Sequence, residues 1–160
     1  MDELGEFTRM NLKGLKNRNK LEEFIKRMLL EESTQKIIQA YYKVYNTLGY
    51  GFLEKVYENA MMKELISMGF SCEKQKLIEV YYEDALVGEY YADIIVDNEV
   101  VIELKATGTI LEEHEVQLLN YLKATKIEVG LLLNFGKKPE FRRKIFTNDK
   151  YSNIKQITEN

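Results

Sequence analysis

The sequence has very few of the residues on which several common kinds of site depend. Among its 160 residues there is one cysteine, Cys72, one histidine, His114, one proline, and no tryptophan. A single cysteine excludes an internal disulfide framework and a multi-cysteine zinc or iron–sulfur site. A cysteine–histidine hydrolase would have His114 as its sole base, and no nucleophile motif lies near either residue. Oxygen-ligated metal is therefore the remaining route to hydrolytic chemistry.

The chain also lacks an excess of positive charge and any long apolar run. It has 23 Lys and Arg against 26 Asp and Glu, a net charge of −3, which excludes a protein that grips nucleic acid by bulk charge. The longest apolar runs, such as residues 129–135, are far too short to span a membrane. The N-terminus has no basic-then-apolar signal pattern, so we expect a cytoplasmic protein with no membrane partner.

The apolar residues that are present, 45% of the chain counting tyrosine, suffice for one compact domain. Their spacing predicts one helix over 21–32, a second that Ser33 or Thr34 caps and Gly49 ends, and further helices over 53–67 and 109–125. Strands are predicted over 77–82, 87–96, 100–105 and 127–134, with 141–146 as a last strand or helix. Strands in a meander, followed by a helical crossover, indicate an α/β domain with a mixed β-sheet flanked by helices.

Polar residues inside the predicted strands are the most informative, because an unpaired buried charge is costly. Glu103 and Lys105 share one face of the strand 100–105, and Asp93 lies in the preceding strand. An odd turn such as 97–99 places Asp93 opposite Glu103, with Cβ atoms ~5 Å apart. Two carboxylates at that separation repel unless a cation such as Mg²⁺ or Mn²⁺ lies between them. The alternative is a cross-strand salt bridge on a solvated face.

Three further groups are candidates, each with an ordinary structural explanation. Glu54 and Glu58 share a helical face and either could reach a metal site, although acidic residues in a first turn also favour the helix dipole. Gln117 and Tyr121 are four apart and could bind a phosphate and a sugar or base, or lie on the surface and in the core. One basic concentration could contact a nucleic-acid backbone or be a solvated face; it comprises Lys137, Lys138, Arg142, Arg143 and Lys144.

Five segments in order resemble the GxxExxY family, a branch of the PD-(D/E)XK nuclease-like superfamily. The first, Gly51-Phe52-Leu53-Glu54-Lys55-Val56-Tyr57, carries the motif that names the family. The others are residues 88–93, 101–106, 114–122 and 130–136, and the resemblance extends from about Ser33 to Phe146. Any one of these segments is weak evidence, whereas five in the expected order are strong evidence.

The resemblance implies a restriction-endonuclease-like PD-(D/E)XK core over 33–147, an N-terminal arm with an appended helix over 1–32, and a polar tail over 148–160. It also implies catalytic roles for six residues: Glu54, Asp93, Glu103, Lys105, Gln117 and Tyr121. Of these, Glu54, Asp93 and Glu103 would bind the metal with the carbonyl of Leu104, and Lys105 would act on the attacking water. Nucleic acid would be bound by Gln117, Tyr121, Lys137, Lys138, Arg142 and Arg143.

Two functions are therefore considered. The first is a Mg²⁺- or Mn²⁺-dependent nuclease that hydrolyses phosphodiester bonds in DNA, with RNA as a second substrate class. The second is a catalytically silent module on the same fold that binds nucleic acid or another protein. A homodimer is compatible with both, and the appended helix is a candidate dimerisation element.

Overall fold

The computed structural model of the chain describes residues 18–147. The predicted arm before residue 18 and the predicted tail after residue 147 lie outside the described residues. The described residues divide between Lys36 and Ile37 into two compact units, and the long helix α2 (Arg18–Leu48) contributes residues to both. Within the described residues, no helix combines the length and apolarity that crossing a membrane requires.

Helix α2 corrects the prediction of two separate helices. Thr34, predicted as a cap, lies inside one continuous helix and donates its hydroxyl to the carbonyl of Leu30 at 2.7 Å. A threonine hydroxyl can bond the carbonyl four residues earlier, so its polar group is satisfied without ending the helix. Lys36 and Glu32 form an ion pair of 2.9 Å across the expected break, and residues 18–48 contain no glycine or proline.

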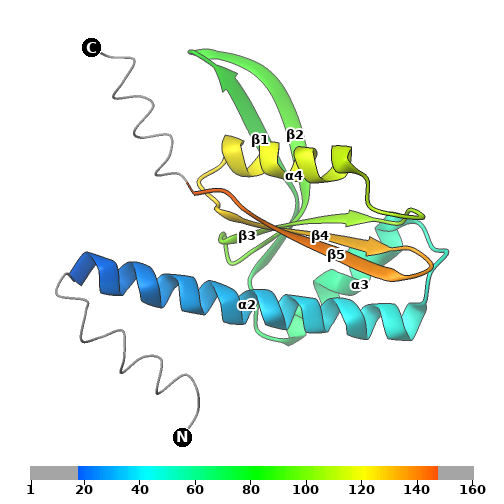
Figure 1. The fold of residues 1–160 in the computed structure, drawn as a ribbon. Helices are drawn as coiled ribbons and strands as arrows, with labels where there is room; N and C mark the ends of the chain where they lie inside the picture. The colour runs from blue at the N-terminus through cyan, green and yellow to red at the C-terminus, as the bar shows by residue number, and fades with distance from the viewer. Residues whose placement is uncertain (1–17, 148–160) are drawn as a thin grey trace, which may run out of the picture. The chain divides into compact units, whose positions relative to one another are not determined.

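Residues 37–147 form a five-stranded mixed sheet flanked by helices (Figure 1), as the sequence predicts. The strands are β1 (Cys72–Tyr82), β2 (Ala85–Val96), β3 (Val100–Lys105), β4 (Val129–Phe135) and β5 (Pro139–Ile145), and they lie side by side in that order. Neighbouring strands are antiparallel except β3 and β4, which are parallel and joined by helix α4 (Glu112–Ala124). The last segment, left open as strand or helix, is strand β5.

Helix α3 (Glu54–Ser67) ends where the sequence predicts, whereas helix α4 begins at Glu112, three residues after the predicted start at residue 109. Gly69 follows α3 at φ 93°, a conformation that favours glycine, and Phe70 N–H donates back to Leu65 O at 3.1 Å. His114 caps the start of α4, because its Nδ1 accepts the N–H of Leu111 at 3.1 Å. The single histidine is thereby used in helix capping.

Strand β4 is buried on both faces and lies in the middle of the core. On one face Leu132 joins a cluster with Leu118 and Leu122 of α4. The helix approaches so closely that a Cβ at Gly130 would lie 2.7 Å from Leu118 Cδ1. On the other face Phe135 stacks on Tyr57 of α3, with ring centroids 4.1 Å apart. Sheet and helices therefore form three layers, which fixes the site on β2 and β3 relative to α3 and α4.

Candidate active site

Asp93 and Glu103 face one another at the end of the β2–β3 hairpin. Val96 pairs with Val100 and Ile94 with Ile102, so the turn has three residues and the same register places Asp93 opposite Glu103. The main chain holds both carboxylates. Asp93 N–H donates to Glu103 Oε1 at 3.3 Å, and Leu104 N–H donates to Asp93 Oδ2 at 2.7 Å. The opposed carboxylates expected from the alternation of the strands are therefore present.

The electrostatics of this pair indicate a shortage of positive charge. Glu103 is only 4% exposed, and burial raises its pKa from 4.5 to about 8, with the charge of Asp93 adding to the effect. Burial also raises the pKa of Asp93, and Glu58 raises it further. The N–H of Leu104 and the charge of Lys105 act in the opposite direction on Asp93. A cation between the carboxylates would offset both the burial and the repulsion.

Lys105 lies close enough to the carboxylates for its charge to lower the pKa of both. It is the last residue of β3, two positions from Glu103, and is half-buried. The structure thus brings together Asp93, Glu103 and Lys105. Leu104, predicted to contribute its carbonyl, contacts the pair through its main-chain N–H.

Further hydrogen bonds connect the pair to helix α3, through Glu58 and not through Glu54. Gln75 Nε2 donates to Glu58 Oε2 at 2.6 Å and lies 3.3 Å from Asp93 Oδ1, so one amide connects the two carboxylates. Glu58 is buried and also pairs with Lys55 Nζ at 2.8 Å. Glu54 is exposed at the first residue of α3.

Sequence reasoning named Glu58 as one of two alternatives and did not find Gln75. Helical spacing could not separate Glu54 from Glu58, because both fall on the face that carries Tyr57 and Met61. Only the packed structure shows that Glu58 is buried and Glu54 is exposed. Gln75 has a φ of 53° inside β1, a backbone state uncommon for glutamine, and the sequence of the strand gives no indication of it.

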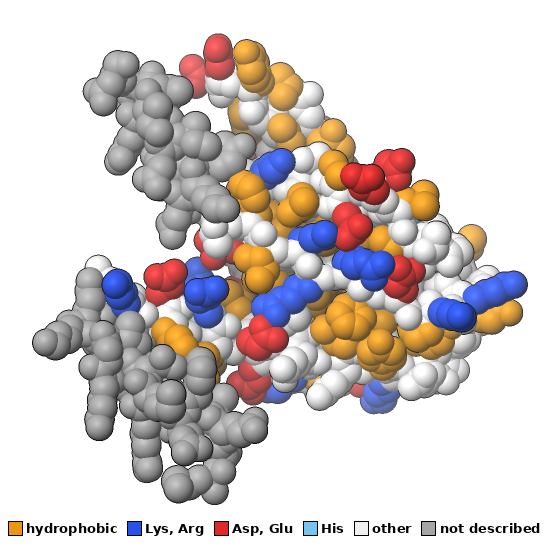
Figure 2. Space-filling view, viewed as in Figure 1, with side chains coloured by type: hydrophobic (Ala, Val, Ile, Leu, Met, Phe, Trp, Pro, Cys, Tyr) orange, Lys and Arg blue, Asp and Glu red, His pale blue; other side chains and the backbone are white. Residues whose placement is uncertain are grey.

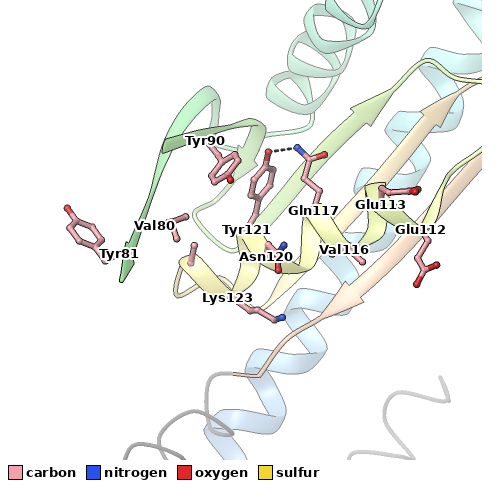
Figure 3. Close-up of a pocket in the computed structure, with 11 residues that line it drawn as sticks. Val80, Tyr81, Tyr90, Glu112, Glu113, Val116, Gln117, Asn120, Tyr121 and Lys123 are labelled. Atoms are coloured by element: carbon pink, nitrogen blue, oxygen red, sulfur yellow. Dashed lines mark hydrogen bonds between the residues drawn. The ribbon is translucent and has the colours of Figure 1, made fainter. Parts of the chain in front are cut away.

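Gln117 and Tyr121 form a hydrogen bond of 2.6 Å on α4, as Figure 3 shows. Burial raises the pKa of Tyr121, and the negative charges of Glu103 and then Asp93 raise it further, which places the hydroxyl within reach of the site's field. The ring of Tyr90 lies 5.6 Å from the ring of Tyr121. The two predicted residues therefore belong to the surroundings of the carboxylate pair.

These side chains line a pocket of about 940 Å³ between α4 and the β1–β2 hairpin (Figure 3). The lining is apolar and aromatic on the hairpin side and mixed on the helix side, with two carboxylates and one lysine. Its residues are Val80, Tyr81, Tyr90, Glu112, Glu113, Val116, Gln117, Asn120, Tyr121, Lys123 and Ala124.

The predicted basic cluster is partly neutralised by neighbouring acids. Arg142 Nη2 lies 2.7 Å from Glu140 Oε1, and Lys144 Nζ lies 2.7 Å from Glu115 Oε1 on α4. Blue and red side chains accordingly alternate over this part of the molecule (Figure 2). Lys137 and Lys138 are exposed in the turn before β5, and Arg143 is half-buried within β5. Nucleic-acid binding by this cluster stays a prediction.

The loop that carries the GxxExxY motif is fixed by its tyrosine. Gly49 and Gly51 have φ of 67° and 109°, values that favour glycine. Tyr57 Oη donates a hydrogen bond to Gly49 O at 2.7 Å and accepts one from Phe52 N–H at 3.2 Å. Tyr57 therefore has a structural role.

Cys72 has no reactive thiolate character at neutral pH, because burial raises the pKa of its thiol to about 11.

The mixed sheet, the helical layers and the carboxylate–lysine group on its central hairpin define a restriction-endonuclease-like α/β fold. The sequence matches the PD-(D/E)XK nuclease superfamily over residues 31–144. The chain belongs to that superfamily. No curated protein matches the sequence.

Two solved structures are similar in fold. The crystal structure of SSO0001 shares 19% identity with a TM-score of 0.45, covering 66% of this chain and 55% of that one. An alkaline exonuclease from Laribacter hongkongensis shares 13% identity with a TM-score of 0.44, covering 64% of this chain and 60% of that one. The match therefore spans little more than half of the length of these two proteins.

Nucleases of this superfamily generally use divalent metal ions. Among residues 18–147, no three His, Cys, Asp or Glu side chains are grouped for metal binding. The donors that are present nevertheless fit a hard cation, because Asp93 and Glu103 offer carboxylate oxygens at a point where burial and mutual repulsion call for positive charge. Water would complete the coordination, as is usual for Mg²⁺.

Proposed function

We propose that this protein is a Mg²⁺-dependent nuclease that hydrolyses phosphodiester bonds in DNA, with Mn²⁺ as an alternative ion and RNA as a second substrate class. The observation that carries this proposal is the buried Asp93–Glu103 pair beside Lys105, a cluster with carboxylate oxygens in excess of positive charge. An ordinary salt bridge would not leave the pKa of a buried carboxyl raised to about 8.

Each residue of the cluster has a distinct role in this proposal. Asp93 and Glu103 would hold the ion, with the Leu104 carbonyl expected from the family resemblance. When bound, the ion supplies a Lewis acid for the phosphate and lowers the pKa of a water. Lys105 orients the attacking water and stabilises the negative charge that develops on the phosphoryl oxygens. Gln75 positions Asp93 through its hydrogen bond at 3.3 Å.

Gln117 and Tyr121 would contact the substrate next to the reacting phosphate. The amide and hydroxyl can donate to phosphate oxygens, and the Tyr121 ring can pack on a sugar or base. Both side chains line the pocket next to α4, and the charges of Glu103 and Asp93 act on the Tyr121 hydroxyl, which supports this role.

We also assign the chain to the GxxExxY branch of the superfamily. The support is the hydrogen bonding of the tyrosine of that motif. Tyr57 Oη closes the loop around Gly51 by donating to Gly49 O and accepting Phe52 N–H. These hydrogen bonds set the start of α3, the helix that carries Glu58.

The nuclease proposal is tested with plasmid, single-stranded and branched DNA, and a matched RNA, in Mg²⁺ or Mn²⁺. Cleavage should be lost on adding a chelator and should fall at least a hundredfold in Lys105→Ala and Glu103→Gln. Glu99→Gln is the matched control, because Glu99 is exposed in the turn between β2 and β3. Cleavage that survives in both site variants would show that the activity comes from elsewhere.

A second candidate function is a silent module that binds nucleic acid or protein. It is favoured by the partial neutralisation of the basic cluster and by the lack, within the described residues, of a three-ligand metal group. Calorimetric titration with Mn²⁺ separates the two functions. Binding that Glu103→Gln abolishes supports the nuclease, whereas the absence of Mn²⁺ binding by the intact protein supports the module.

A further inference from the structure

Much of the β1–β2 hairpin lies outside the main sheet. Strand β2 pairs with β3 only through Ile94, Ile95 and Val96, and from residue 85 to 92 its ladder partner is β1 alone. Residues 76–92 thus form a two-stranded ribbon, here named the hairpin arm, which extends past α4 in Figure 1. A two-stranded ribbon is marginally stable by itself, and β1 is also an edge strand that leaves main-chain groups open.

The arm has one covered face and one uncovered face. Residues directly opposite in a ladder share a face, and Val80 and Tyr90 face the pocket next to α4. The other face carries Leu77 opposite Tyr91, which are 41% and 55% exposed. Contiguous exposed apolar side chains of this kind usually mark an interaction site.

The charges of the arm determine what could cover this face. The arm carries four carboxylates, Glu79, Glu83, Asp84 and Glu89, and one basic residue, Lys76 at its base, which forms an ion pair with Glu73 at 3.0 Å. Glu79 lies directly opposite Glu89 in the ladder, a like-charge arrangement that destabilises a sheet. The hairpin tip at the top of Figure 2 shows orange and red side chains without blue.

Two occupants are disfavoured by this charge pattern. A nucleic-acid backbone would bring phosphates against four carboxylates, and the one lysine of the arm, Lys76, already pairs with Glu73. A second copy of the arm, related by a two-fold axis, would bring the carboxylates of one copy against those of the other. A segment with lysine or arginine beside apolar side chains matches both the exposed apolar residues and the carboxylates of this face. Its cation would relieve the repulsion between Glu79 and Glu89.

We propose that the uncovered face of the hairpin arm docks a basic and apolar segment of a partner protein. Apolar side chains of the partner pack on Leu77 and Tyr91, and a cationic side chain binds between Glu79 and Glu89. The open edge of β1 allows the segment to add as a further strand, so that alternate residues lie on this face. This proposal uses no residue of the active site and does not depend on nuclease activity.

The test uses a synthetic peptide of repeated Leu-Ser-Lys-Ser with one terminal tryptophan, whose fluorescence reports the peptide alone because the protein has no tryptophan. Micromolar binding is expected, weakened at least tenfold in the double variant Glu79→Gln/Glu89→Gln. The double variant Glu23→Gln/Glu99→Gln makes the same change in net charge at exposed positions outside the arm and should bind within twofold of the wild type. A peptide with glutamate in place of lysine should not bind.

A second variant addresses the apolar contribution without altering charge. Leu77→Ser/Tyr91→Ser should weaken binding of the lysine peptide severalfold, with circular dichroism checking that the sheet is intact. The proposal is overturned if the intact protein does not bind the peptide, or if both charge variants lose binding equally. It is also overturned if a single-stranded oligonucleotide binds through the arm, or if sedimentation shows self-association that the arm variants abolish.

Discussion

Replacing Glu103 by glutamine should stabilise the metal-free protein, although Glu103 is proposed to be essential for activity. The pKa of Glu103 rises from 4.5 to about 8 on folding, so the folded state binds more protons than the unfolded state between these pH values. Stability therefore falls as pH rises through that window. The corresponding cost is about 1 kcal/mol at pH 5 and about 2–4 kcal/mol at pH 7. Glutamine removes this cost and keeps an oxygen to accept Asp93 N–H.

The assay is urea unfolding of the wild type and Glu103→Gln in a chelator, at pH 5 and pH 7 and constant ionic strength. The free energy of unfolding of the variant should exceed that of the wild type, and the difference should grow with pH. Glu99→Gln, which changes an exposed carboxylate nearby, should show no such growth. An unchanged difference at the two pH values, or a variant less stable at pH 7, would refute the electrostatic reasoning.

Three further predictions concern packing, the motif loop and the acid on α3. Gly130→Ala should lower the free energy of unfolding by about 1–3 kcal/mol in urea, because the new Cβ would lie 2.7 Å from Leu118 Cδ1. The double variant Gly130→Ala/Leu118→Ala should lose less free energy of unfolding than the sum of the two single variants. Tyr57→Phe should cost about 1–2 kcal/mol in the same assay, because the hydroxyl bonds two main-chain groups of the loop. In Mn²⁺ calorimetry, Glu58→Gln should weaken Mn²⁺ binding about 3–10-fold and Glu54→Gln less than twofold, because only Glu58 connects to the carboxylate pair. Equal effects of the two variants would restore Glu54 as the acid of the site.

The sheet and the central pair were predictable because both depend on local periodicity. Alternation places Glu103 and Lys105 on one face, and an odd turn is enough to set Asp93 opposite Glu103, as the register confirms. The apolar run of β4 likewise predicts burial on both faces, which is observed. Regular strands carry this information in neighbouring residues, so no long-range contact is needed to obtain it.

The features that were missed depend on contacts between distant segments or on competition within a helix. Threonine is a residue type that often caps a helix, yet the hydroxyl of Thr34 donates to Leu30 O inside α2. The ion pair of Lys144 with Glu115 joins β5 to α4, and only the packed structure brings these residues together. The bridge from Glu58 through Gln75 likewise joins α3 to β1. Sequence spacing within one element cannot reveal these partners.

The main-chain contacts of the carboxylate pair explain why the two side chains stay together in the folded protein. Two solvent-exposed carboxylates would rotate apart, but Glu103 accepts the N–H of Asp93 and Asp93 accepts the N–H of Leu104, just beyond the last paired residues of β2 and β3, Ile94 and Ile102. Moving either side chain would leave a buried N–H without an acceptor, which costs about 1–3 kcal/mol. The sheet thus maintains an arrangement that is unfavourable without a cation. Such a preorganised site, held against its own electrostatics by backbone hydrogen bonds, favours the nuclease over a silent module.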